Sequence, residues 1–230
     1  EHLKGIESRA GEDRARIKTL NAWKDKQEKT MGADTRTLTF GADEVARFID
    51  LEINLHATHQ DLVFEEFKDG FVGIRTHPDL RLTPSAKRGV HKVYGKARNS
   101  EGVEGKNIWG KRADWVHYYG TIEGKQAGIA FFSHPSNLTK KGEKSWWHAR
   151  DYGLISANPF APTKIGGDGE HTVSKGQSLT LRYRFVFHSG SPEDAKIENR
   201  FARYAQDPGH PTSIMPNHPG YPEDYLSPKK

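Results

Sequence analysis

The sequence predicts a mainly β protein, an antiparallel β-sandwich with one helix near its C-terminal end. Two segments carry this prediction. Residues 179–187, LTLRYRFVF, and residues 47–56, RFIDLEINLH, alternate apolar and polar side chains with a two-residue period, which is the pattern of half-buried strands. Frequent turn residues separate further short strand-like segments, and no strand–helix alternation suggests a parallel sheet.

The other strands follow from similar short patterns bounded by turns. In chain order, the predicted strands are residues 36–40, 47–56, 62–67, 71–77, 113–122, 126–133, 148–157 and 179–187. The connections at 68–70 and 123–125 contain glycine next to charged residues and are typical of tight hairpin turns. Residues 81–112 have few apolar side chains, so we expect a long loop there.

A single helix start is visible late in the chain. Ser191 can act as N-cap, Pro192 suits the first helical position, and two acids follow in the first turn, so we expect a helix of about 14 residues. From Asp207 onward, six of the chain's 12 prolines fall in the last 24 residues. The sequence therefore predicts one β-sandwich domain over residues 1–206 and a Pro-rich tail over 207–230.

Composition narrows the classes of partner. The net charge is +5, but 35 Lys and Arg are spread among 30 Asp and Glu, without the basic block of a nucleic-acid-binding arm. No apolar run is long enough to cross a bilayer, and the absence of cysteine excludes disulfides and thiolate chemistry. We expect no nucleic-acid or membrane partner. A periplasmic or secreted location is favoured over a cytoplasmic one, although any export signal would have to be removed or lie outside this chain.

The strongest functional signal lies in residues 133–160. Strand alternation places Trp146, His148, Arg150 and Tyr152 on one face. Aromatic rings beside an imidazole and a guanidinium suit a sugar or a carboxylated ligand, because arginine pairs with carboxylate in two-pronged geometry. Alternatively, the same side chains hold loop backbone by cation–π contacts and hydrogen bonds.

Two polar residues of this segment precede prolines. His134 and Asn158 stand before Pro135 and Pro159, where the backbone is restricted, as a preorganised site requires. Each could equally be a hydrogen-bonded structural residue. No spacing of histidines and carboxylates is diagnostic of a metal site, and no nucleotide-binding fingerprint is present, so we expect neither a metal nor a cofactor.

Several motifs in the same order resemble the bacterial PmoA-like family, which is named after a methane oxygenase and whose function is essentially unassigned. The motifs are WGKRADWVHYYGTIEGKQAGIAFFSHPSN (109–137) and WHARDYGLISANPF (147–160), and the likeness extends over residues 36–190. Two features depart from the family. Ser133 stands where the family typically has Asp, and a His-rich segment that would precede EHLKG is missing, so we expect the chain to be truncated at its N-terminus.

The resemblance implies a supersandwich-like β fold, often found in carbohydrate-processing proteins, and not a membrane copper oxygenase, which needs spanning helices. We therefore expect an enzyme of carbohydrate breakdown, a hydrolase or lyase acting on a sugar or uronate. His134 and His148 would supply the acid–base chemistry. The expected substrate-binding residues are Arg75, Trp115, Asn137, Trp146, Arg150, Tyr152 and Asn158. The alternatives are a non-catalytic carbohydrate-binding module and a purely structural domain.

Overall fold

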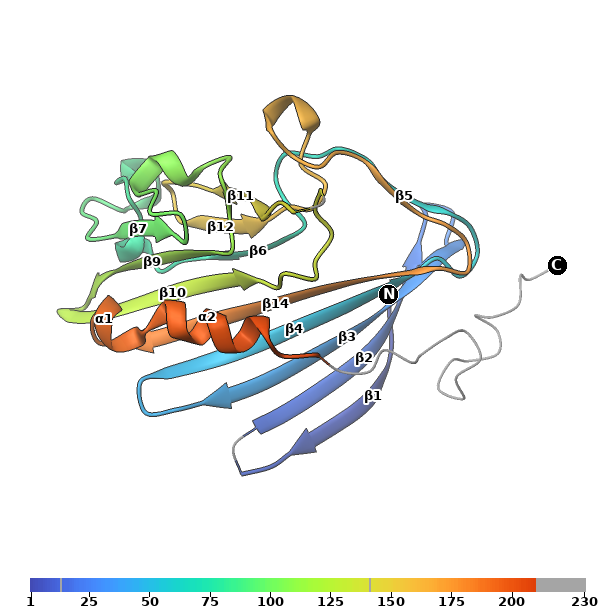
Figure 1. Cartoon of the computed structure of the whole chain (residues 1–230), viewed down its shortest axis with the longest axis horizontal. Coiled ribbons are helices and arrows are strands. Elements are labelled where there is room, and N and C mark those ends of the chain that lie inside the picture. Colours follow the sequence, from blue (N-terminus) through green and yellow to red (C-terminus); the bar gives the residue numbers. More distant parts are fainter. Residues whose placement is uncertain (13, 141, 210–230) are drawn as a thin grey trace.

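The computed structural model describes residues 1–12, 14–140 and 142–209, and most of its regular structure is antiparallel sheet (Figure 1). The large sheet contains eight strands, in the spatial order β1 (His2–Ala10), β2 (Arg14–Lys24), β3 (Thr30–Ala42), β4 (Ala46–His56), β14 (Ser178–Ser189), β10 (Lys125–Ser133), β9 (Trp115–Ile122) and β7 (Lys96–Asn99).

Two smaller sheets complete the strands of the described residues. A four-stranded sheet has the order β6 (Val72–Arg75), β12 (Leu154–Ala157), β11 (Ser145–Ala149) and β8 (Arg112–Ala113), and β5 (Leu62–Phe64) pairs with β13 (His171–Val173). Four 3-10 turns lie in the connections: η1 (Pro78–Leu80), η2 (Ala86–Arg88), η3 (Gly105–Ile108) and η4 (Thr163–Ile165).

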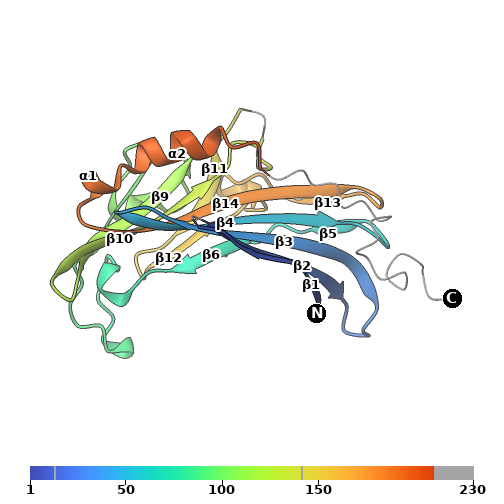
Figure 2. The same cartoon turned by 90° about the horizontal axis from the view of Figure 1, so that it is seen from below.

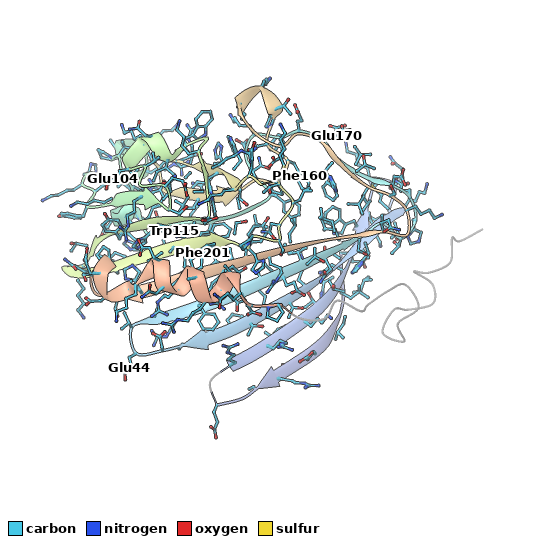
Figure 3. All side chains as sticks on the ribbon, in the orientation of Figure 1. Glu44, Glu104, Trp115, Phe160, Glu170 and Phe201 are labelled. Carbon is cyan, nitrogen blue, oxygen red and sulfur yellow. The ribbon has the colours of Figure 1, made fainter. Side chains whose placement is uncertain are left out.

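The four-stranded sheet and the C-terminal helices cover opposite faces of the large sheet (Figure 2). The helices are α1 (Pro192–Ala195) and α2 (Ile197–Ala205). Phe201 of α2 packs against a cluster that includes Trp115 and Phe132 of the large sheet; Trp115 and Phe201 are labelled in Figure 3. This arrangement confirms the predicted antiparallel β-sandwich with a helical segment near its C-terminal end.

The main core lies between the large and the four-stranded sheet. Phe131 and Tyr183 enter it from the large sheet, and Trp147 and Ile155 enter it from the other side, all with no more than 1% of their surface exposed. The rings of Phe131 and Trp147 meet edge to face with centroids 5.1 Å apart, a favoured aromatic geometry. The other face of the four-stranded sheet points away from this core.

The two segments with the clearest two-residue period form the central strands β4 and β14. They pair antiparallel, with Leu51 opposite Tyr183, and their apolar positions contact the main core. Successive side chains alternate across a strand, so one face of each strand meets the main core and the other face points to the opposite side of the large sheet. The predicted strands at these positions are confirmed.

Other element predictions were wrong in part. Residues 148–157 form the ends of two strands, β11 and β12, around a turn in which Gly153 has φ +84°; a β-strand cannot continue through such a residue. The turn at 68–70 joins no hairpin, since β5 pairs with β13 and β6 pairs with β12. The expected long loop at 81–112 contains strand β7, whose pairing with β9 closes the edge of the large sheet.

The helix begins as predicted but is interrupted. Ser191 and Asp194 form a reciprocal capping box, and Pro192 occupies the first turn. Lys196 then adopts a left-handed backbone conformation, φ 46°, and separates α1 from α2. No helix in the described part of the chain is long and apolar enough to cross a membrane. Most of the expected Pro-rich tail, 207–230, lies outside the described residues.

Candidate functional site

Strand β11 directs its side chains alternately into the core and out of the four-stranded sheet. Trp147 points into the main core, and its indole Nε1 donates to the carbonyl of Ala113 at 2.9 Å. Trp146 and His148 point to the other face, with ring centroids 6.3 Å apart. The alternation predicted from the sequence is thus confirmed for this strand, and it places His148, with 1% of its surface exposed, on the outer face of the four-stranded sheet.

Trp109, which follows η3, fixes the imidazole of His148. Its indole Nε1 donates to His148 Nδ1 at 3.2 Å, and indole is a donor only. The neutral imidazole of His148 therefore carries its proton on Nε2. Because Trp109 is 36% exposed and its ring centroid is 6.4 Å from that of His148, one indole both covers the histidine and faces solvent.

Two arginines and two aromatic rings alternate beside His148. The guanidinium of Arg150 lies 6.0 Å from the ring of Trp109 and 5.4 Å from the ring of Tyr152. Arg75 lies 5.5 Å from Tyr152. Arg75 joins this face because β6 pairs with β12 in the register that sets Arg75 opposite Leu154. We call Arg75, Tyr152, Arg150, Trp109 and His148 the arginine–aromatic cluster.

The cations of the cluster are not neutralised by carboxylates. Within residues 1–12, 14–140 and 142–209, neither Arg75 nor Arg150 forms an ion pair. Each guanidinium makes cation–π contacts with aromatic rings instead. Stacking on rings leaves the edge of a guanidinium, with its N–H donors, open for a planar anion. The cluster can therefore bind a carboxylate while its rings pack against an apolar surface.

A turn after β5 brings a carboxylate to the same place. Asp69 Oδ1 lies 3.9 Å from His148 Nε2, and the Asp69 side chain is 58% exposed. Asn158 holds this turn, since its side-chain amide donates to the carbonyls of Phe67 at 2.6 Å and Lys68 at 3.3 Å. Asn158, expected to bind substrate, instead positions the loop that carries Asp69.

His148 is neutral at neutral pH. Burial lowers the pKa of its imidazole below the ordinary value, and the charge of Arg150 lowers it further, while Asp69 acts in the opposite direction. A neutral imidazole with its proton on Nε2 can donate a hydrogen bond toward the position beside Asp69.

The second predicted catalytic histidine lies elsewhere. His134 follows β10 of the large sheet, and its ring lies 5.2 Å from Tyr204 of α2, on the helix-covered side. Arg182 Nη1 lies 3.1 Å from its Nε2, and Ser136 Oγ lies 2.7 Å from its Nδ1. The main core separates this face from His148, so one substrate group cannot contact both histidines. Burial, followed by the charge of Arg182, lowers the pKa of His134.

Three other predicted binding residues have structural contacts. Asn137 is buried, donates to the carbonyl of Arg182 at 2.7 Å and accepts from its backbone N–H at 2.6 Å. Trp115 is buried in the cluster beneath α2. Trp146 is fully buried, and its Nε1 donates to the carbonyl of Ile165 at 3.1 Å. These side chains stabilise the scaffold, and only Trp146 among them contacts the candidate site.

The sequence did not single out Trp109 and Asp69. Trp109 opens one of the motifs that carry the family resemblance, so a signal existed, but its position depends on the loop after η3. Asp69 was assigned only to a turn. The sequence could not place either residue at the site, because both lie in loops that fold over the outer face of the four-stranded sheet.

Comparison with known proteins places the sequence in one family. Residues 1–202 match the family model described as a family of unknown function (DUF6807). No curated protein matches the chain. The resemblance to the PmoA-like family stays a prediction.

Two solved structures are similar to the chain at low identity. The Slr1438 protein from Synechocystis sp. PCC 6803 is 10% identical, with a TM-score of 0.40 over 81% of this chain; the chain spans 66% of that protein's length. A galactose mutarotase related enzyme from Lactobacillus acidophilus is 8% identical, with a TM-score of 0.31 over 81% of this chain and 72% of that one.

Proposed function

The chain belongs to the family of unknown function DUF6807, and we propose that it binds an acidic carbohydrate at the arginine–aromatic cluster. One observation carries this proposal: two guanidinium groups that have no carboxylate partner among the described residues alternate with two aromatic rings. Rings of this kind stack on the apolar faces of sugars, and a guanidinium edge binds carboxylate in two-pronged geometry.

The exposure of the aromatic side chains supports a ligand that lies across this face. Trp109 is 36% exposed, and Phe67, in the turn held by Asn158, is 63% exposed. Exposed aromatic rings offer flat apolar surfaces on which a sugar face can stack. We infer that the sugar rings lie over Trp109 and that the carboxylate points to Arg150 and Arg75.

His148 and Asp69 favour a second candidate, a hydrolase or lyase acting at the same cluster. The neutral imidazole can donate a hydrogen bond from Nε2 to a substrate oxygen that gains negative charge, and the exposed carboxylate 3.9 Å away can accept a substrate proton. In this candidate burial, followed by the charge of Arg150, lowers the pKa of His148 and keeps the imidazole neutral. His134 has no part in the reaction, because it lies on the helix side of the large sheet.

Calorimetric titration with trigalacturonate tests the proposed binding. We expect Arg150→Met to weaken binding at least tenfold, about 1.4 kcal/mol, because a charge-assisted contact to the carboxylate is lost while the aliphatic stem remains. The methyl-esterified trisaccharide, which has no carboxylates, is expected to bind the wild type and Arg150→Met equally. Arg203→Met, an exposed arginine on α2, is the matched control. Equal affinity of wild type and Arg150→Met for trigalacturonate would contradict the proposal.

Turnover separates an enzyme from a binding module. His148→Ala removes both the Nε2 donor and the titratable group. If the cluster is catalytic, product release from a polygalacturonate substrate should fall at least 100-fold in this variant, with trigalacturonate affinity changed much less. Retained affinity, with no product formed by the wild type or the variant, would assign the chain as a binding module.

A further inference from the structure

Arg81, immediately after η1, is a buried cation with unsatisfied donors. Only 9% of its surface is exposed, and its Nε and Nη1 atoms are buried without a hydrogen-bond partner in the described part of the chain. It forms no ion pair with a carboxylate of these residues. Burying an unpaired guanidinium is strongly unfavourable. Such a group indicates an acceptor that the described residues do not supply.

Arg81 borders the turn that carries Arg150 and Tyr152. The backbone N–H of Leu82 donates to the carbonyl of Asp151 at 2.8 Å. A Cβ atom built on Gly153 would lie 3.3 Å from Arg81 Cγ, so the arginine stem lies against this glycine. The buried guanidinium therefore belongs to the neighbourhood of the arginine–aromatic cluster.

Gly153 also ties the turn to the end of β6. Its carbonyl accepts from the backbone N–H of Thr76 at 2.8 Å, next to Arg75. A side chain at Gly153 would collide with Thr76 Oγ1, only 2.3 Å from the Cβ position, and its φ of +84° disfavours other residues. The close approach of three segments thus places Arg75, Arg81 and Arg150 around a single turn.

The charges around this turn are predominantly positive. Three guanidinium groups face one carboxylate within the turn, that of Asp151, and no ion pair joins it to any of them among the described residues. Asp69 lies farther along the cluster, beside His148. An anionic ligand at this turn would be attracted by all three cations. Binding would cost the least desolvation at Arg81, because this guanidinium is already buried.

We propose that Arg81 is the buried end of an oxyanion-binding site whose other members are the half-buried Arg150 and the exposed Arg75, and that it determines the specificity of the chain for acidic sugars. This inference rests on the proposed function and names the chemical group on the sugar that the site recognises. The group is a carboxylate or a sulfate ester, and both present negatively charged oxygens that accept hydrogen bonds from guanidinium. Arg81 supplies donors that neutral sugars leave unpaired, so neutral sugars are discriminated against.

The test compares Arg81→Met with the wild type and Arg203→Met in calorimetric titrations. The probes are trigalacturonate, its methyl ester and a sulfated galactose trisaccharide. We expect Arg81→Met to bind trigalacturonate at least tenfold more weakly than the wild type and the methyl ester unchanged. Weakening restricted to trigalacturonate identifies a carboxylate as the natural group, and weakening restricted to the sulfated sugar identifies a sulfate ester. Should Arg81→Met not fold, Arg81→Lys keeps the charge without the planar fork and is expected to bind at least fivefold more weakly.

A second measurement separates this inference from the proposed function. Thermal unfolding is followed with sodium galacturonate or sodium sulfate against sodium chloride at equal ionic strength. A rise in Tm in the wild type and Arg203→Met, but not in Arg81→Met, supports the oxyanion site even if no trisaccharide binds. Unchanged affinity in Arg81→Met together with equal Tm shifts in all three proteins would overturn the inference and leave water as the partner of Arg81. Tight binding of the methyl ester that is lost in Trp109→Ala would then still support a carbohydrate site.

Discussion

Replacing Trp147 by alanine is expected to lower the free energy of unfolding by about 3–5 kcal/mol. The indole is fully buried between the two sheets and packs edge to face on Phe131. Its loss leaves a cavity in the main core and removes the hydrogen bond to the carbonyl of Ala113. Urea denaturation followed by circular dichroism measures the change.

Trp109→Ala is the matched control for this prediction. Trp109 is 36% exposed and lies outside the core, so we expect it to cost about 1 kcal/mol. A loss below about 1 kcal/mol for Trp147→Ala would contradict the assignment of this tryptophan to the packed interface of the two sheets.

Lowering the pH from 7 to 5 is expected to reduce the free energy of unfolding by about 4 kcal/mol. Burial lowers the pKa of His56 to about 4, and burial together with the neighbouring His188 lowers that of His117 to about 2, from 6.5 in the unfolded chain. Between these values the unfolded state binds more protons, so stability falls as the pH decreases below 6.5. Each histidine contributes about 2 kcal/mol at pH 5.

The geometry of His117 explains the size of this effect. Its Nε2 lies 2.9 Å from Nε2 of His188, and its Nδ1 is buried without a partner among the described residues. Protonation of His117 would place a buried positive charge beside His188 and the backbone of Gly128. We expect His117→Gln to lose about half of the pH dependence between pH 7 and 5. Equal unfolding free energies of the wild type at pH 7 and 5 would contradict the account.

Strands were predictable where one face meets the core and the other does not. The segments 47–56 and 179–187 have such faces because they become the central strands β4 and β14. Strands β1 and β2 were not predicted. The small cluster that holds Leu20 and Ala33 gives them little core of their own, so their sequences show no regular alternation.

Turns and loops account for the other differences. The sequence 148–157 contains enough strand-forming residues to suggest one strand, yet Gly153 at positive φ allows the chain to reverse and align β11 with β12. This reversal, and not strand alternation, brings Arg150 and Tyr152 to the side of His148. The grouping of these three side chains therefore has a cause that the sequence did not reveal.

Half of the candidate site depends on contacts distant in sequence. Arg75, His148, Arg150 and Tyr152 could be named from residue type, strand ends and alternation. Arg81, Trp109 and Asp69 lie in loops and were not predictable. Their positions depend on how η1, η3 and the turn after β5 pack on the four-stranded sheet. His134 shows the converse: a histidine of the same motif points to the helix side, because it continues β10 of the large sheet.

The most direct test of an acidic-sugar site at the arginine–aromatic cluster is a titration with trigalacturonate monitored by the indole N–H signals of the five tryptophans. The signal of Trp109 is assigned with a Trp109→Phe variant. We predict that it shifts with saturating dependence on ligand concentration, while the signals of Trp115, beneath α2, and Trp147, in the core, stay in place. A saturating shift of Trp115 with Trp109 unchanged would place the ligand on the opposite face, and no shift of Trp109 at all would contradict the proposed site.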